Sequence, residues 1–245
     1  MKQFSLTDRG TVRKENQDSA LVTEIRARHC YAVIVCDGMG GVHGGKLASE
    51  LAVSAYMAEL RRSLLRSSEK RPALRPLMQA ACAAANDVVY RYSCSNTEYA
   101  GMGTTLVAAT IRGATAELLN VGDSRAYLIT RRGVTQLTQD HSMVEEMVQR
   151  GEITREEARS HPQKNFITRA VGVDAAVEAD SFTVKLHYGD RLLLCSDGLS
   201  NALSEETIGE ICRGSRGPDQ ICRKLIQQAN ARGARDNITA AVVRY

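Results

Sequence analysis

Residues 104–138 read TTLVAATIRGATAELLNVGDSRAYLITRRGVTQLT and decide the class of fold. Four runs rich in apolar and β-branched residues follow one another here, at a spacing of about ten residues. The breaks between them are short and contain Arg112-Gly113 and Arg132-Gly133. Tight breaks of this kind join antiparallel neighbours, whereas parallel strands need a crossover of roughly a dozen residues or more. The stretch therefore predicts an antiparallel meander and argues against alternating strands and helices.

The N-terminal side of this stretch predicts strands followed by two long helices. Residues 31–36, YAVIVC, are apolar without interruption, which is typical of a strand buried on both faces. Shorter strands are expected at residues 3–7 and 19–25. Apolar residues then recur at helical spacing over 47–58 and again over 74–88, with Pro72 placed near the start of the second helix.

The C-terminal side predicts short polar helices and then a mixture of strands and helices. Thr154 and Glu157 have the spacing of a capping box. The expected elements are helices at 142–150, 154–159, 205–212 and 218–231 and strands at 181–186, 191–195 and 238–244. No repeat or low-complexity linker interrupts the chain. We therefore expect a single domain over residues 1–245, with a mostly polar helical excursion at about 140–172.

Composition excludes several classes of protein. The chain has 245 residues, of which 43% are hydrophobic, and its 32 basic and 28 acidic residues leave a net charge of +4. Aromatic residues make up 4% and Trp is absent, so base stacking is poorly supported and we expect no nucleic-acid partner. No apolar run approaches membrane-spanning length, so we expect no membrane partner. The seven cysteines form no C-x-x-C pair, which favours reduced thiols in a cytoplasmic protein. We also expect a monomer.

Aspartates occur at the ends of several predicted strands. Asp37, Asp123 and Asp197 each follow an apolar run or a tight glycine turn. Asp236 precedes the last strand, and Asp18 begins the second. One Asp-Gly pair is usually a turn. Repetition after buried strands instead suggests that carboxylates converge at one sheet edge, where they would suit hard cations such as Mg²⁺ and Mn²⁺.

The glycine cluster after Cys36 also fits a nucleotide-binding pattern. Gly40 to Lys46 match G-x-x-x-x-G-K after a buried strand and before a helix. However, Leu47 lacks the hydroxyl that would bind Mg²⁺, and a meander differs from the parallel sheet of such proteins. The nucleotide-hydrolysing alternative is therefore the weaker one. His43 in this cluster has no metal-ligand spacing to another histidine, so we expect a structural or surface role for it.

Six short motifs occur in a fixed order from residue 10 to residue 239. They are Gly10-x-x-Arg13-x-x-Asn16-Gln17-Asp18, Asp37-Gly38-Met39-Gly40-Gly41, Gly103-Thr104-Thr105, Val121-Gly122-Asp123-Ser124-Arg125, Ser196-Asp197-Gly198-Leu199 and Asp236-Asn237-Ile238-Thr239. Together they resemble the motif series of the PPM (PP2C-type) metal-dependent serine/threonine phosphatases, with the closest similarity to compact bacterial members that oppose Hanks-type kinases. The resemblance covers nearly the whole chain. It implies an α+β fold, a four-layer α-β-β-α sandwich of two mostly antiparallel sheets flanked by helix pairs.

The resemblance also implies a metal centre. Asp37 would bridge two Mn²⁺ or Mg²⁺ ions, and the Gly38 carbonyl would bind one of them. Asp197 and Asp236 would complete the other site. Asp123 matches a ligand of a third ion in bacterial members. Two such cations can activate a water and neutralise charge on a phosphoryl group.

Two further residues match roles in catalysis. Arg13 matches the residue that binds the substrate phosphate, for which a planar guanidinium is well suited. Asp18 matches the carboxylate that holds metal-bound water. Three positions depart from the wider pattern, of which Lys46, where many bacterial relatives have Glu, is expected to be a surface change. Met39 stands where eukaryotic relatives have a His proposed as general acid, and Asn201 stands where some members have an Asp, so we expect weaker occupancy of the third metal site.

The implied activity is hydrolysis of phosphoserine and phosphothreonine on proteins by a metal-activated water. The partners would be phosphorylated proteins and a cognate Ser/Thr kinase. Residues 140–172 are similar to the flap that affects substrate choice in this family. One alternative is a stress-response or sporulation phosphatase that acts on an antagonist of an anti-sigma factor. Another is a non-catalytic regulator that binds phosphoproteins without turnover.

Overall fold

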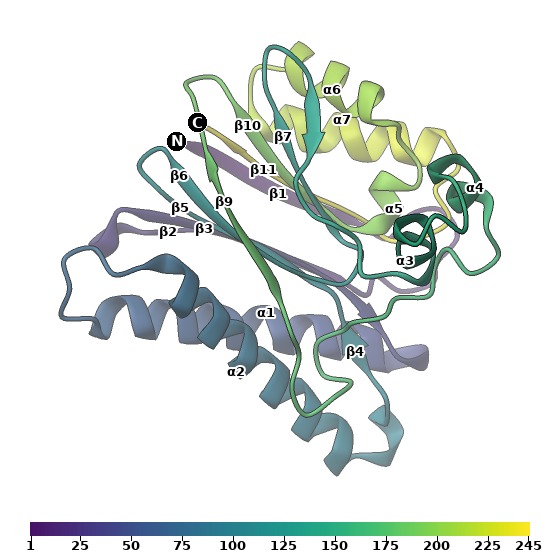
Figure 1. Ribbon diagram of the computed structural model, residues 1–245, viewed down its shortest axis with the longest axis horizontal. Helices are drawn as coiled ribbons and strands as arrows, with labels where there is room; N and C mark the ends of the chain where they lie inside the picture. Colours follow the sequence, from purple (N-terminus) through teal and green to yellow (C-terminus); the bar gives the residue numbers. More distant parts are fainter.

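Two antiparallel sheets pack face to face at the centre of the protein and are covered by helices on both outer faces (Figure 1). The computed structural model describes residues 1–245 apart from the side chains at positions 42, 43 and 159, so the role expected of His43 lies outside the described residues. Helices α1 (Gly41–Arg66) and α2 (Leu74–Ser95) cover one face. Helices α6 (Glu205–Gly214) and α7 (Pro218–Ala231) cover the other. The expected four-layer α-β-β-α sandwich is confirmed.

The two sheets contain strands that are distant in sequence. The first has the order β1-β11-β10-β7-β8, with bounds Lys2–Asp8, Ile238–Arg244, Arg191–Cys195, Arg125–Ile129 and Val134–Gln136. The second has the order β2-β3-β5-β6-β9, with bounds Asp18–Ile25, Cys30–Met39, Leu106–Arg112, Thr115–Val121 and Asp180–Lys185. Strand β4 (Gly103–Thr104) pairs with the end of β3. Short 3-10 helices occupy Arg26–Arg28 and Thr97–Tyr99.

The strand predicted at 31–36 lies at the middle of the molecule and is buried on both faces. Val33 and Val35 point into the core between the two sheets. Ile34 and Cys36 point into the core beneath α1 and α2. A third core lies between the other sheet and α6 and α7. The uninterrupted apolar run therefore reflects a strand with a hydrophobic layer on each side.

The stretch at 104–138 is antiparallel, but the prediction of one meander is wrong. Strands β5 and β6 form a hairpin in one sheet, whereas β7 and β8 form a hairpin in the other. The chain changes sheet between Val121 and Arg125. Gly122 allows this crossing because its φ is +97° and a Cβ there would lie 2.7 Å from Thr105 Cγ2. As a result, Asp123 lies where the two sheets meet.

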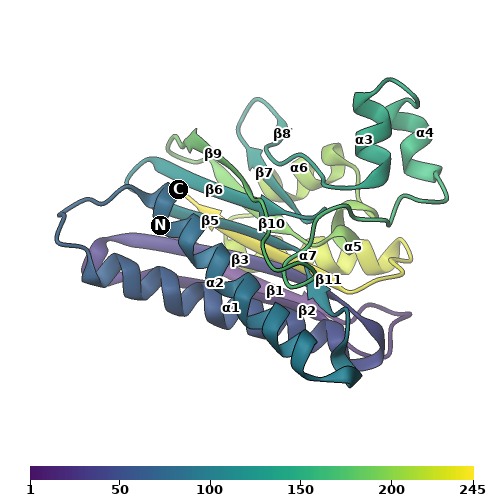
Figure 2. The same ribbon diagram turned by 60° about the horizontal axis from the view of Figure 1, so that its bottom comes forward.

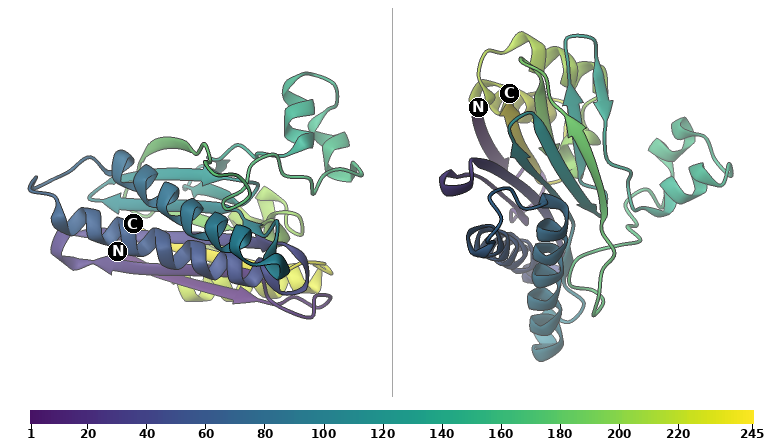
Figure 3. Two further views of the ribbon diagram at one scale, coloured as in Figure 1. Left: turned by 90° about the horizontal axis from the view of Figure 1, so that it is seen from below. Right: turned by 60° about the vertical axis from the view of Figure 1, so that its left-hand side comes forward.

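Residues 140–172 leave the sandwich and return to it at Val171, which pairs with Thr104, and the two short helices between these points stand away from it (Figures 2 and 3). Helix α3 (Met143–Gln149) begins after Ser142, whose side chain accepts a hydrogen bond from the Glu145 amide. Helix α4 (Arg155–Ser160) begins with the predicted capping box of Thr154 and Glu157. We call residues 140–172 the flap. None of the helices that the structure describes is long and apolar enough to cross a membrane.

Candidate metal centre

The register between β2 and β3 places two carboxylates opposite each other. Asp18 begins β2 and faces Asp37 near the end of β3. Like charges directly across an antiparallel pair are destabilising, so this arrangement is unusual for a structural role. The strand β3 continues through Asp37 to Met39, further than the apolar run predicted. The two carboxylates therefore belong to paired strands and not to loops.

Asp18 is buried and is held on one side only. Its Oδ2 accepts hydrogen bonds from the hydroxyls of Ser196 and Thr239, each at 2.7 Å. Its Oδ1 is buried and has no hydrogen-bond partner among the described residues. Burial raises the pKa of Asp18 to about 7, and nearby Asp197 and Asp236 also raise it. The free oxygen is therefore available to a water or a cation.

Backbone contacts fix the position of Asp37. Its amide donates to the Thr105 hydroxyl at 2.9 Å, and its carbonyl accepts from the Thr104 hydroxyl at 2.8 Å. The Thr105 amide also donates to the Asp37 carbonyl at 2.9 Å. Burial raises the pKa of the Asp37 carboxyl well above its usual value, and Asp18 and Asp197 add to this effect. The side chain is thus held in place without a cationic partner of its own.

Gly38 lies where two backbones come close together. A Cβ at Gly38 would lie 1.8 Å from the Gly45 carbonyl oxygen of α1 and 2.8 Å from the Gln17 carbonyl oxygen. The Gly38 amide donates to the Gln17 carbonyl at 3.1 Å. Only glycine fits between these groups. The N-terminal part of α1 therefore packs directly on the strand that carries Asp37.

Asp197 and Asp236 come from the C-terminal third of the chain. Asp197 begins the short helix α5 (Asp197–Ser200), which sequence patterns did not indicate. A hydrogen bond from the Asp37 carboxyl lowers its pKa, but burial and Asp236 outweigh this and raise it. The Asn201 amide donates to Asp197 Oδ2 at 3.0 Å, while Asp197 Oδ1 is buried without a partner among the described residues.

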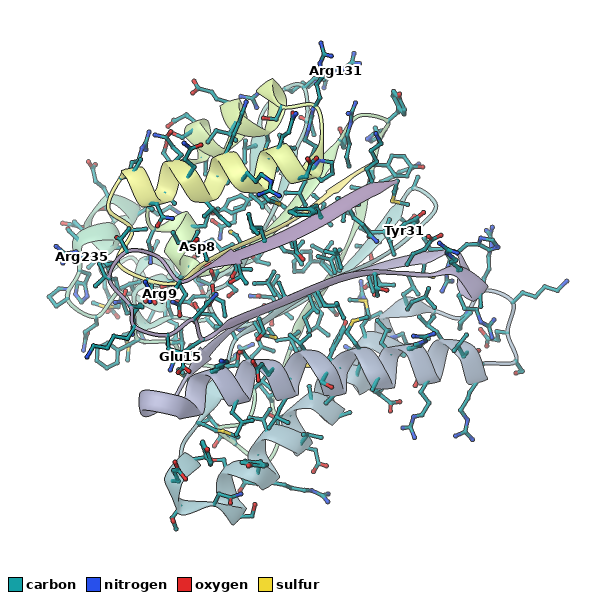
Figure 4. All side chains as sticks on the ribbon, turned by 180° about the vertical axis from the view of Figure 1, so that it is seen from behind. Asp8, Arg9, Glu15, Tyr31, Arg131 and Arg235 are labelled. Atoms are coloured by element: carbon teal, nitrogen blue, oxygen red, sulfur yellow. The ribbon has the colours of Figure 1, made fainter. Side chains whose placement is uncertain are left out.

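Arg13 lies beside this group of carboxylates. Its Nη2 donates to Asp236 Oδ2 at 2.7 Å, and about half of the side chain is exposed. Asp236 Oδ1 accepts from the Asn237 amide at 2.8 Å. The loop that carries Arg13 meets the segment around Asp236 at one end of the sandwich, where Arg9, Glu15 and Arg235 also lie (Figure 4). The ion pair leaves part of the guanidinium facing solvent.

Asp123 lies on the flap side of the centre. Burial raises its pKa well above the usual value, Asp197 and Asp140 add to this, and Arg125 opposes it. Arg125 is itself held by Asp140, with its Nη2 2.6 Å from Asp140 Oδ2. The flap is joined to this loop by His141, whose Nδ1 accepts from the Gly122 amide at 3.1 Å.

A cavity of about 330 Å³ opens between the flap and α5. Asp123 and Asp197 lie in its wall, together with Arg155 and Lys164 from the flap. The cavity thus connects the carboxylates with charged side chains of the flap.

The donor set fits divalent cations. Asp18, Asp37, Asp123 and Asp197 all have raised pKa values because burial opposes their charged forms, and a bound cation would reverse this. Among the side chains that the structure describes, no three His, Cys, Asp or Glu residues form a ready-made ligand set. Hard cations such as Mg²⁺ need only one or two carboxylates each, because waters and carbonyls supply the other ligands. The unpartnered oxygens of Asp18 and Asp197 support the same conclusion.

The structure brings together all of the predicted site residues: Arg13, Asp18, Asp37, Gly38, Asp123, Asp197 and Asp236. Sequence reasoning included the supporting residues in the motifs but gave them no role. Ser196 and Thr239 hold Asp18, and the Asn237 side chain accepts from the Gln17 amide at 2.8 Å and donates to the Arg9 and Glu15 carbonyls. A signal was present, because Ser196 and Asn237 lie directly beside Asp197 and Asp236 in sequence and Thr239 lies three residues after Asp236.

Comparisons with known proteins identify the family of the chain. The family model described as protein phosphatase 2C matches residues 10–242. The serine/threonine phosphatase stp of Listeria monocytogenes is 41% identical over 239 residues, which cover 97% of this chain and 93% of the relative. The solved structure of the S. agalactiae serine/threonine phosphatase has a TM-score of 0.90 at 37% identity and covers 99% of this chain and 98% of that one. The catalytic domain of the serine/threonine protein phosphatase PstP, solved in complex with two manganese ions, has a TM-score of 0.85 at 33% identity, with 98% and 96% covered. The chain therefore belongs to the protein phosphatase 2C family.

Proposed function

We propose that this protein is a metal-dependent phosphatase that hydrolyses phosphoserine and phosphothreonine on proteins. One observation carries the proposal. Five buried or half-buried carboxylates from separate segments lie close enough to repel one another, and Arg13 lies on the solvent side of this group. Such a cluster is costly without cations. The relatives named as serine/threonine phosphatases over nearly the whole chain support the same activity.

The metal ligands that we propose are Asp37, Gly38, Asp197 and Asp236, which would hold two divalent cations, with Asp123 available to a third. The manganese-bound PstP structure supports two ions in the central site, and either Mn²⁺ or Mg²⁺ suits oxygen ligands. When bound, such ions lower the pKa of a water and neutralise charge on the transferring phosphoryl group.

The protein's own residues position the reactants. Arg13 has a guanidinium that can bind two phosphate oxygens, and its ion pair with Asp236 sets its direction. Asp18 can orient a water through Oδ1, because Ser196 and Thr239 already occupy Oδ2. Residue 39 cannot protonate the leaving serine or threonine oxygen, since Met39 carries no acidic proton. That proton must come from another group at the centre.

The proposed substrates are phosphoproteins, including a Ser/Thr kinase and the proteins that it modifies. The cavity between the flap and α5 places charged side chains next to the centre, so contacts with protein residues beside the phosphorylated one are available. We propose the cytoplasm as the compartment, because six of the seven cysteines are buried, where free thiols pack as small apolar groups.

Hydrolysis of a phosphothreonine peptide tests the proposal directly. Purified protein should release phosphate with Mn²⁺ or Mg²⁺, lose activity with a chelator and regain it when the cation is restored. Asp37→Asn should abolish turnover. Asp87→Asn is a matched control, because this exposed α2 carboxylate pairs only with Arg91 on the same helix. Equal activity with and without divalent cations, or an active Asp37→Asn variant, would show that the proposed chemistry is wrong.

A further inference from the structure

Three arginines come together at the end of the sandwich that lies away from the metal centre. Arg191 begins β10 and pairs across the sheet with Arg244 near the end of β11. Both point toward the helix layer, because Leu193 and Val242, two residues along each strand, face the core beneath α6 and α7. Arg213 lies in the last turn of α6. We call Arg191, Arg213 and Arg244 the arginine cluster.

The cluster concentrates positive charge without neutralising it. Arg191 and Arg244 are like charges in directly opposed positions, which is unfavourable in an antiparallel pair. Burial lowers the pKa of Arg191, and Arg244 and Arg213 lower it further. Among the described residues, no carboxylate forms an ion pair with any of the three. A bound anion would therefore reduce the repulsion within the arginine cluster.

Two buried polar atoms at the cluster also lack partners. The Ser215 residue is 3% exposed, and its hydroxyl has no hydrogen-bond partner among the described residues. Arg191 Nε is also buried and has no hydrogen-bond partner among the described residues. Buried donors of this kind are normally paired with protein or with a bound group. Both atoms belong to the same corner, since Arg191 Nη2 donates to the Ser215 carbonyl at 3.4 Å.

A purely structural role explains only part of the arrangement. Cations near a helix C-terminus are favourable, and Arg191 and Arg244 donate to the carbonyls of Ser215 and Arg216 just after α6. Arg191 Nη1 also donates to the Gly189 carbonyl at 3.3 Å. Arg213 takes no part in these bonds. Its guanidinium folds over Gly209, with Nη1 2.9 Å from where a Cβ would lie, and the residue is exposed. Stabilisation of the loop after α6 therefore explains neither the position of Arg213 nor the unpartnered hydroxyl of Ser215.

We propose that the arginine cluster and Ser215 form a binding site for a phosphate dianion, separate from the metal centre. Arg191 and Arg244 keep N–H groups beyond those that bind the loop carbonyls. With Arg213 and the Ser215 hydroxyl they supply donors in several directions, which suits the four oxygens of a tetrahedral anion better than the two of a carboxylate. The site lies at the start of β10, whereas Asp197 follows the end of this strand (Figure 1). The five residues of β10 alone span roughly 15 Å. One phosphate cannot occupy both places. The ligand is either free inorganic phosphate or a second phosphoryl group on a bound protein.

Calorimetric titration of inorganic phosphate into chelator-treated protein tests the site. Arg213→Gln should remove one class of binding, with affinity reduced by about tenfold or more at that site. Arg131→Gln is the matched control, because it removes the same charge from the exposed turn at this end of the sandwich (Figure 4). Equal phosphate binding by wild type and Arg213→Gln, or no phosphate binding by either beyond that of the metal centre, would overturn the proposal.

A second variant separates binding from folding. Ser215→Ala should weaken phosphate binding but leave unfolding in phosphate-free buffer unchanged, since the hydroxyl has no internal partner to lose. Loss of stability in that buffer would contradict the assignment. A non-hydrolysable phosphonoserine peptide distinguishes the two sources: competition with phosphate at the Arg213-dependent site supports a protein phosphoryl group, and its absence supports the free ion. The titration requires no turnover, so its failure would leave the proposed phosphatase activity intact.

Discussion

Replacing Gly38 by alanine should separate the strand of the metal centre from helix α1. The added Cβ would lie 1.8 Å from the Gly45 carbonyl oxygen, whereas real Cβ atoms essentially never come within 3.0 Å of another heavy atom. The two backbones must therefore move apart by about 1.2 Å or more. Overpacking of this kind typically lowers the free energy of unfolding by about 1–3 kcal/mol. Because Gly38 adjoins Asp37, a displacement of about 1 Å should also reduce kcat/KM by roughly 100-fold.

Gly133→Ala provides the control. Its φ is not positive, and a Cβ there would meet no atom within 4 Å, so the substitution should be nearly neutral. Urea unfolding gives the stability of each variant, and hydrolysis of a phosphothreonine peptide gives kcat/KM. If Gly38→Ala matched Gly133→Ala in both measurements, the tight contact between β3 and α1 would not determine the geometry of the centre.

Three further outcomes follow from the same contacts. Arg13→Ala should lower kcat/KM by about 10- to 100-fold, mainly through KM, because charge-assisted hydrogen bonds contribute about 1.5–3 kcal/mol. Steady-state kinetics measures this effect, with Arg9→Ala as the control variant. Equal effects of the two substitutions would argue against a role of Arg13 in binding phosphate. In chelator, the free energy of unfolding should fall as pH rises from about 4 to about 7, because the folded protein keeps the Asp18 proton up to a pKa of about 7 while the unfolded chain releases it near pH 4. Urea titrations at pH 5 and pH 8 measure this fall, which Asp18→Asn should reduce; a rise with pH would contradict it. Asn201→Asp should destabilise the metal-free protein, since a donor to Asp197 at 3.0 Å becomes a like charge, yet it should tighten binding of an additional Mn²⁺. Calorimetry resolves the second effect, and unchanged Mn²⁺ affinity would exclude Asn201 as a determinant.

Long periodic segments with clear ends were predictable from the sequence. Strands β10 and β11 and helix α7 have the expected bounds, because uniform burial and a proline at the first helical position leave little ambiguity. The sheet to which each hairpin of residues 104–138 belongs could not be predicted in the same way. The apolar runs of this stretch specify antiparallel hairpins, but both sheets bury one face against the shared core, so local pattern cannot show which sheet a hairpin joins.

The proposed metal ligands could be predicted from the sequence, whereas the residues that hold them in place could not. Aspartates after buried strands are easy to recognise in a sequence, because burying an unpaired charge costs free energy and is therefore rare. Serine and threonine at the same strand ends are ordinary residues, so the hydrogen bonds from Ser196 and Thr239 to Asp18 became visible only in three dimensions. The start of α5 at Asp197 was hidden for another reason, since a helix of one turn has too few residues to show a period.

The pairing of β1 with β11 has a consequence for how the enzyme is made. Strand β1 has β11 as its neighbour in the sheet, and Arg13 meets Asp236 across the same junction. While the ribosome is still synthesising the chain, β1 therefore has no partner, and Arg13 and Asp18 have not yet met the residues that hold them. Contacts between segments this far apart in sequence also form slowly. The nascent protein should therefore have no complete metal centre until β11 has left the exit tunnel and paired with β1.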